Sequence, residues 1–178
     1  MFLLLTCLHI GATASDDTTS RIVLRINELR ALHGAGPVTW SPVLAEYAAS
    51  WAGALAPDWL RHSIGNAYGE NVATISSSAG IGSKVLAAID LWYAECERYS
   101  YAVPTFSEST SNFTQLVWAA TRMLGAAVSP NGIVVMEFAP MGNIVGRFAH
   151  NVRPPGSNET LLLLPAATLP SALCSCTC

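Results

Sequence analysis

Charged residues are scarce in this chain: they make up 12% of its 178 residues, and the formal net charge is −3 at pH 7. The chain lacks any run of lysine and arginine that could follow a phosphate backbone, so the sequence argues against nucleic acid as a partner. Long apolar runs are also lacking. No internal stretch reaches the roughly 18 to 20 residues that a membrane-spanning helix needs, so we expect no transmembrane segment.

The short apolar stretch at residues 2–10 is typical of the core of a secretory signal peptide. Small residues at positions 12–14 supply a cleavage site before Ser15, although the Lys or Arg that usually precedes such a core is missing. The alternative is a buried N-terminal helix, which Gly11 and the polar run at 15–20 disfavour. We therefore expect residues 1–14 to be a signal peptide and the protein to be secreted to the extracellular space.

The chain has five cysteines, of which Cys7 would leave with the signal peptide. Cys96 falls on the apolar stripe of a predicted helix, so we expect a buried packing thiol. The other three, Cys174, Cys176 and Cys178, alternate at the C-terminus, unlike the two-residue gap common in zinc sites. An oxidising compartment would allow four cysteines to pair in three ways, and the sequence does not choose among them. We expect residues 156–178 to be a disordered tail.

Helical patterns come first along the chain. Ser20 is placed to cap a helix whose apolar residues share one face as far as Leu32. Ser41-Pro42 is a strong start for a second helix, which Pro57 should end. Residues 84–99 carry a third helical stripe.

Strand patterns follow. Residues 70–75 favour a short strand, and residues 113–118 an extended segment or strand edge. Two apolar runs, 125–128 and 133–138, flank a turn-rich tip and predict a β-hairpin. Helices followed by mixed elements and a hairpin indicate an α+β fold.

Several segments also resemble, in order, the motifs of the CAP superfamily, which comprises cysteine-rich secretory proteins, antigen 5 and plant pathogenesis-related proteins. The most specific is Phe113-Thr114-Gln115-Leu116-Val117-Trp118; the others include Leu32–Pro37, Gly69-Glu70-Asn71, Trp92–Glu95 and Phe138–Asn143. The resemblance covers residues 20–155 and implies one CAP (SCP) domain with a three-layer α-β-α sandwich. Met136 stands where the family commonly has a cysteine, so the family disulfides cannot form, and we expect packing to hold the fold.

In the CAP family two histidines and two glutamates line a central cleft, and the matching positions here are His62, Glu70, Glu95 and Asn112. Asn112 replaces the second histidine. An amide oxygen is a poor zinc ligand, so we expect weak or absent zinc binding and no cofactor, with His62 the remaining metal candidate beside Glu70 and Glu95. Each residue has a plainer reading: His62 as a loop histidine bonded to one carboxylate, Glu70 as a strand-edge charge, and Glu95 as a solvated helix glutamate.

We expect a protein without catalytic residues. Cys96 is turned about 100° away from Glu95 on its helix, and no serine lies in a nucleophile-elbow pattern. The resemblance implies extracellular roles in defence, host interaction or signalling, with binding of a sterol, another lipid or a protein partner. The alternative is a divalent-metal-dependent hydrolase in the same cleft, which Asn112 weakens. Asn112 and Asn158 each begin a glycosylation acceptor, and Asn158 is the better candidate.

Overall fold

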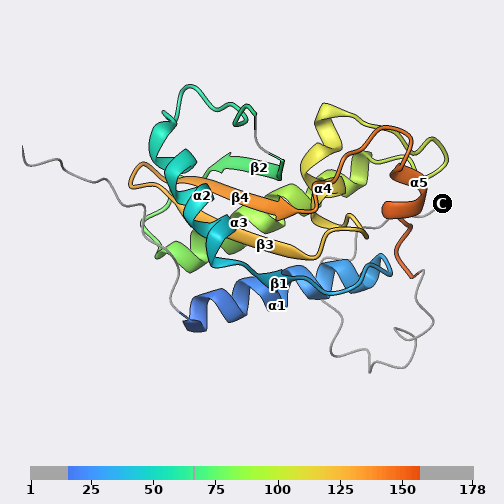
Figure 1. Cartoon of the computed structure of the whole chain (residues 1–178), viewed down its shortest axis with the longest axis horizontal. Coiled ribbons are helices and arrows are strands. Elements are labelled where there is room, and N and C mark those ends of the chain that lie inside the picture. The colour runs from blue at the N-terminus through green and yellow to red at the C-terminus, as the bar shows by residue number, and fades with distance from the viewer. Residues whose placement is uncertain (1–15, 66, 157–178) are drawn as a thin grey trace, which may run out of the picture.

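The computed structural model describes residues 16–65 and 67–156, in which a four-stranded sheet lies between helices (Figure 1). The strand order is β1-β3-β4-β2. These strands are β1 (Thr39–Trp40), β2 (Gly69–Thr74), β3 (Met123–Val128) and β4 (Ile133–Ala139). β1 runs parallel to β3, whereas β3 and β2 each pair antiparallel with β4, so β2 is an edge strand.

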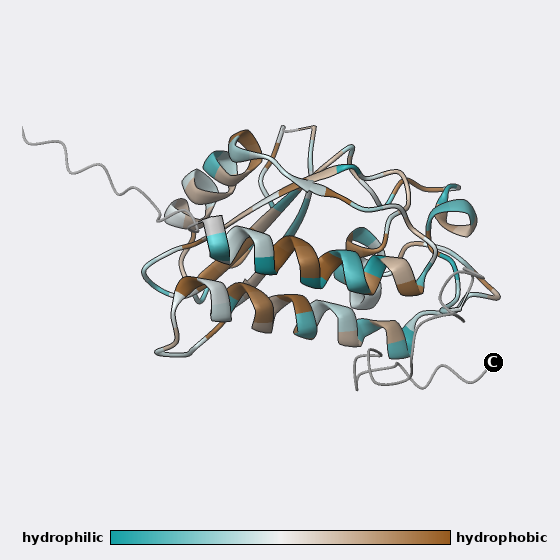
Figure 2. Ribbon diagram, turned by 90° about the horizontal axis from the view of Figure 1, so that it is seen from below, coloured by the Kyte–Doolittle hydropathy of each residue, from teal (hydrophilic) through white to brown (hydrophobic). Residues whose placement is uncertain are grey.

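Helices cover both faces of the sheet. On one face α2 (Pro42–Ala54) buries Ala48 and Ala52 in a cluster with Ala127, Ile133 and Val135. On the other face α1 (Asp16–Leu32) and α3 (Ile81–Tyr93) lie side by side (Figure 2), joined by an ion pair of 2.7 Å between Arg25 and Asp90. The α+β fold and its three-layer α-β-α sandwich are therefore confirmed. In the described part of the chain, no helix combines the length and the apolar character that crossing a bilayer requires.

Most helix predictions are correct, but the start of α1 is not. α1 begins at Asp16, so Ser20 lies inside the helix rather than capping it. The predicted start of α2 is confirmed, because the Ser41 hydroxyl accepts a hydrogen bond of 3.3 Å from the Leu44 N–H and Pro42 is the first helical residue. The stripe predicted at 84–99 divides into α3 and a tighter 3-10 helix, η1 (Ala94–Arg98).

The prediction of an extended segment at residues 113–118 is wrong. These residues lie mostly in a short helix, α4 (Ser111–Leu116), which follows the 3-10 turn η2 (Glu108–Thr110). Its aromatic and β-branched residues favour a strand. Hydrogen bonds from distant residues override that preference, because the Glu95 carboxylate accepts from the N–H groups of Asn112 and Phe113 at 3.0 and 3.1 Å. An anion at these unpaired N–H groups stabilises the start of a helix.

Two sulfur-containing residues lie in the core. Met136 is fully buried, as expected of a residue that fills the core. Cys96 is also fully buried, as expected; it is disulfide-bonded rather than a thiol, a pairing that the sequence had left open. The other cysteines, Cys7, Cys174, Cys176 and Cys178, lie outside the described residues, as do the predicted signal peptide and all of the predicted tail except Gly156.

A buried cation, Arg30, fixes the chain on the C-terminal side of α4. Its guanidinium is fully buried and donates hydrogen bonds of 2.9 to 3.0 Å to four backbone carbonyls, those of Gly36, Leu116, Trp118 and Thr121. Burial, and then the charge of Arg122, lower the Arg30 pKa to about 10, so the group stays protonated at neutral pH. One side chain of α1 therefore ties the loop that follows α1 to the segment that leads from α4 to β3.

We predict that Arg30→Lys lowers the free energy of unfolding by about 3 kcal/mol or more. A single ammonium group cannot reach four carbonyls that a planar guanidinium bonds at once, and the carbonyls left behind stay buried. Urea denaturation measures the change, with Arg21→Lys on the exposed side of α1 as the matched control, expected within about 0.5 kcal/mol of the parent. A loss below about 1 kcal/mol for Arg30→Lys would contradict this role.

Candidate functional site

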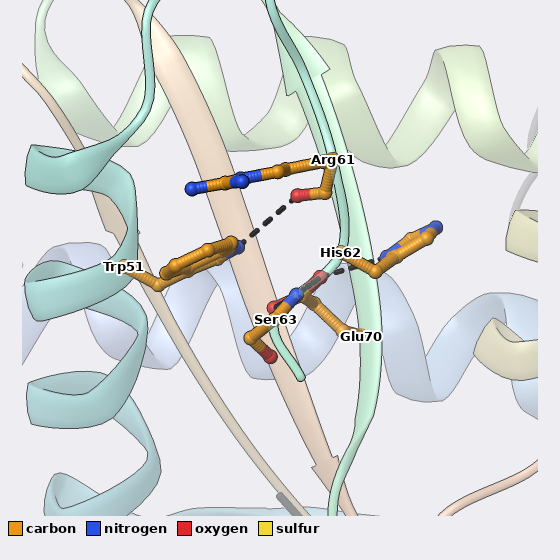
Figure 3. A network of polar contacts seen from close by, with 5 residues as sticks. All are labelled: Trp51, Arg61, His62, Ser63 and Glu70. Carbon is orange, nitrogen blue, oxygen red and sulfur yellow. Dashed lines mark hydrogen bonds and ion pairs between the residues drawn. The ribbon is translucent and has the colours of Figure 1, made fainter. Parts of the chain in front are cut away.

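The first pair of site residues lies on the α2 side of the sheet. His62 Nδ1 is 2.7 Å from Glu70 Oε1, and the Ser63 N–H donates to the same carboxylate at 3.1 and 3.3 Å (Figure 3). The His62 side chain is 66% exposed, whereas the Glu70 side chain is only 4% exposed. The carboxylate is therefore a buried anchor, and the imidazole is the part of the pair that a ligand can touch.

Aromatic contacts hold the loop that carries His62. The Trp51 indole N–H donates to the Arg61 carbonyl at 3.2 Å, and the Arg61 guanidinium carbon lies 5.5 Å from the Trp51 ring centre and 3.8 Å from that of Trp59. Figure 3 shows Arg61 above the Trp51 ring, next to the pair formed by His62 and Glu70. Cation–π contacts of this kind stabilise a loop that has little regular structure.

The second pair, Glu95 and Asn112, lies between η1 and α4. The Asn112 side-chain amide donates to Glu95 Oε1 at 2.7 Å, and the Asn112 backbone N–H donates to Glu95 Oε2 at 3.0 Å. Since Phe113 N–H also reaches Oε2, both carboxylate oxygens are engaged. Asn71 links this pair to β2 by donating from its side chain to the Asn112 carbonyl at 3.0 Å.

The four positions thus form two separate pairs that line two different hollows. His62 and Glu70 line a hollow of about 230 Å³ together with Phe106, Gln115 and Met141. Glu95 and Asn112 line another of about 410 Å³ along β2. Among the described residues no group of three His, Cys, Asp or Glu side chains could hold a metal ion, so the structure does not gather His62, Glu70 and Glu95 as one ligand set.

Gln115 forms a wall of the smaller hollow. Its amide oxygen accepts from the Gly142 N–H at 2.8 Å, and a side chain at Gly69 would overlap that amide. Asn143 ties the same wall to α4, donating to the Ser111 carbonyl at 2.9 Å and accepting from the Thr114 hydroxyl at 2.5 Å. The family motifs at 113–118 and 138–143 therefore meet at this hollow.

One residue of the site, Glu137, was missed by the sequence reasoning. It pairs across the strands with Glu70 and is fully buried. In the described part of the chain neither of its two side-chain oxygens has a hydrogen-bond partner, and the residue opposite it on β2 is Glu70. The sequence does contain a signal for this residue, because Glu137 is the one charged residue in the apolar run 133–138.

Each member of this carboxyl and imidazole chain has a shifted pKa. Burial, and then the Glu70 charge, raise the Glu137 pKa to about 9, so Glu137 is protonated at neutral pH. Burial by itself raises the Glu70 pKa, but hydrogen bonds with His62 and Ser63 and the neighbouring Glu137 carboxyl outweigh it and hold that pKa below its usual value. The hydrogen bond to Glu70 raises the His62 pKa, and burial opposes it. At neutral pH the shifts favour one anion, Glu70, between two proton-bearing neighbours.

We predict that Glu137 makes the fold less stable as the pH rises. Between pH 4.5 and about 9 the folded protein keeps a proton that the unfolded carboxyl has released, so the stabilisation is full at low pH and is lost across this range. In Glu137→Gln the amide keeps a hydrogen-bond donor and removes the titration. Urea denaturation from pH 5 to 9 should show a steeper decline in the parent, by at most about 1.4 kcal/mol per pH unit for one proton.

The matched control is Glu46→Gln, an exposed glutamate of α2, whose pH dependence should follow that of the parent. Parallel curves for the parent and Glu137→Gln would show that Glu137 does not hold a proton in the folded state.

The residues around Asn112 do not fit a zinc site. The Asn112 amide directs its N–H, not its oxygen, at Glu95, and the Glu95 oxygens are already engaged by N–H groups.

The hydrogen bond from Asn112 to Glu95 also bears on glycosylation. The Asn112 side-chain nitrogen is engaged, and Phe113 and Thr114 are buried, so the glycosylation acceptor at Asn112 is poorly presented. The other acceptor, Asn158, lies outside the described residues.

We predict that Asn112→His binds zinc at least tenfold more tightly than the parent protein, since imidazole is a good zinc ligand and an amide is a poor one. Titration calorimetry with zinc chloride measures both affinities. Asn112→Ala, which removes the amide without adding a ligand, is the control and should bind no better than the parent. Equal affinity in the parent and Asn112→His would contradict the role assigned to Asn112.

Comparison with known proteins agrees with the geometry. The model of the cysteine-rich secretory protein family, CAP, matches residues 23–138. Protein PRY2 of Saccharomyces cerevisiae is 37% identical over 78% of this chain and 42% of its own length. Pathogenesis-related protein PRMS of Zea mays is 34% identical over 81% of this chain and 92% of its own length. The chain spans about half the length of the two yeast relatives, 42% of PRY2 and 56% of the Repressed by EFG1 protein 1 of Candida albicans.

Solved structures show the same fold. BmVAL-1 superposes with a TM-score of 0.66 at 20% identity, covering 84% of this chain and 89% of its own. NaASP2, solved with Zn²⁺, gives a TM-score of 0.64 at 21% identity, covering 80% and 87%. On the matching family model and these relatives, the chain belongs to the cysteine-rich secretory protein (CAP) family.

Proposed function

We propose that this CAP protein is a secreted, non-enzymatic binding protein whose ligand is a sterol or another lipid. The observation that carries the proposal is the set of exposed apolar side chains in and around the hollow that His62 lines. Phe106 and Met141 line that hollow and are 45% and 37% exposed. Ile64, next to Ser63 in the loop, is 91% exposed. A hollow that combines polar groups with exposed apolar side chains suits an amphipathic molecule with one polar end.

The size of the hollow decides how such a ligand would bind. Its volume of about 230 Å³ lies below the roughly 300 to 1,000 Å³ of pockets that enclose a drug-sized ligand. The ligand would place a hydroxyl or head group near the exposed His62 ring and lay its apolar part across Phe106 and Met141. Contact with an open surface, rather than enclosure, is the mode we propose.

The alternative, a metal-dependent hydrolase, has no observation of comparable weight. Glu95 accepts three N–H groups and His62 is bonded to Glu70, so neither pair presents an open set of metal ligands. Cys96 is disulfide-bonded and so offers no thiol nucleophile. The residues of the cleft therefore support binding better than hydrolysis.

A radiolabelled sterol-binding assay tests this proposal. We expect saturable binding at micromolar protein and a loss of about tenfold or more in Phe106→Asp, because a charge replaces apolar contact area at the rim. Leu24→Asp is the matched control: Leu24 is 61% exposed on α1 and should not affect binding. No saturation, or an equal loss in Leu24→Asp, would remove the proposal.

A further inference from the structure

Half of the backbone hydrogen-bonding groups of β2 point away from the sheet. In an antiparallel pair, bonded and non-bonded residue pairs alternate. Ile75 N–H donates to the Gly132 carbonyl at 2.8 Å, and the register carries this alternation to Ala73 and Asn71. The N–H and C=O groups of Glu70, Val72 and Thr74 therefore point outward. Outside the ladder with β4, these three residues make no backbone–backbone hydrogen bond in the described part of the chain.

A groove runs beside this free edge. It is the hollow of about 410 Å³, lined by residues 72–74 of β2 and by Leu91, Trp92 and Arg98 of α3 and η1. Leu60 and Leu91 are 41% and 56% exposed there, and the buried Thr74 hydroxyl has no hydrogen-bond partner. Outward backbone groups next to apolar side chains match the chemistry of another extended backbone.

The two charged residues that line the groove, Glu95 and Arg98, differ in how many hydrogen-bond partners they have. The Glu95 carboxylate is satisfied by three N–H groups of α4, so it offers little to a ligand. Arg98 donates only to the Ser109 carbonyl, at 3.2 and 2.9 Å, and the ion pairs within residues 16–65 and 67–156 do not include it. A carboxylate on the ligand would form an ion pair with the Arg98 guanidinium and accept hydrogen bonds from it.

We propose that the edge of β2 binds an extended peptide segment of a partner protein as an additional strand, with an aliphatic side chain against Leu91 and a carboxylate at Arg98. Alternate side chains of an added strand face the same side, so both contacts come from residues two apart. The proposal goes beyond lipid binding, because it uses a different hollow and needs neither His62 nor Phe106.

The probe is a fluorescein-labelled heptapeptide, TVTDTVT, titrated against the full chain and followed by fluorescence anisotropy. We expect saturable binding at or below about 1 mM, and binding at least about fivefold weaker for the lysine peptide TVTKTVT. Two further peptides carry N-methyl groups on one or the other alternate set of residues. Methyl groups on the peptide edge that faces β2 should abolish binding, and methyl groups on the opposite edge should leave binding unchanged.

Two protein variants locate the site. Val72→Pro removes an outward N–H while leaving the ladder to β4 intact, and should weaken binding about fivefold or more. Arg98→Gln should remove the preference for aspartate over lysine, whereas Arg21→Gln, an exposed arginine of α1, should keep it. If Val72→Pro fails to fold, the methylated peptides decide the question on the parent protein.

Several outcomes would overturn the proposal. These are no binding of TVTDTVT at 1 mM, equal binding of both methylated peptides, or unchanged binding by a folded Val72→Pro. A concentration-dependent dimer with slow hydrogen exchange at residues 72 and 74 would assign the edge to a second copy of this chain instead. None of these results bears on sterol binding, which the Phe106 variant tests separately.

Discussion

The rest of the site depends on how α4 is held, and two opposite charges hold it. The Glu95 carboxylate accepts the N–H groups at its start, and the buried Arg30 guanidinium takes the carbonyls at its end and beyond. Both charges match the helix dipole. They reach α4 from η1 and α1, so the six-residue helix keeps its place without strong propensity of its own. Asn112, Gln115 and the wall of the smaller hollow take their positions from it.

A second constraint crosses the edge of the sheet. Glu70 and Glu137 are cross-strand neighbours, which would repel if both were ionised. Burial keeps Glu137 protonated, so it does not repel the Glu70 carboxylate, and His62 then meets a single anion. The exposed ring of His62 is thus tied, through Glu70, to a buried acid of β4. The protonation states of these three side chains therefore link the loop that carries His62 to the sheet, in addition to packing.

The sequence predicted much of the architecture because its signals were local. Ser41-Pro42 marked the start of α2, and the apolar runs around residues 129–132 marked the hairpin. α4 was missed because its residues favour a strand, and the hydrogen bonds that override that preference come from Glu95 and Arg30. The carbonyls bound by Arg30 lie as many as 91 positions away, a separation that no periodic pattern reveals. The CAP resemblance placed His62, Glu70, Glu95 and Asn112, but not their division into two pairs.

The Gln115 amide occupies space that side chains at two other positions would otherwise fill. A side chain at Gly69 would overlap it, and one at Gly142 would come within 2.8 Å of it. Three residues from β2, α4 and the loop after β4 therefore share one volume. A larger residue at 69 or 142 would displace the Gln115 amide and so free the Gly142 N–H, and at 142 it would also come within 2.9 Å of the Trp118 ring. The shape of this wall is therefore set jointly by residues 69, 115 and 142.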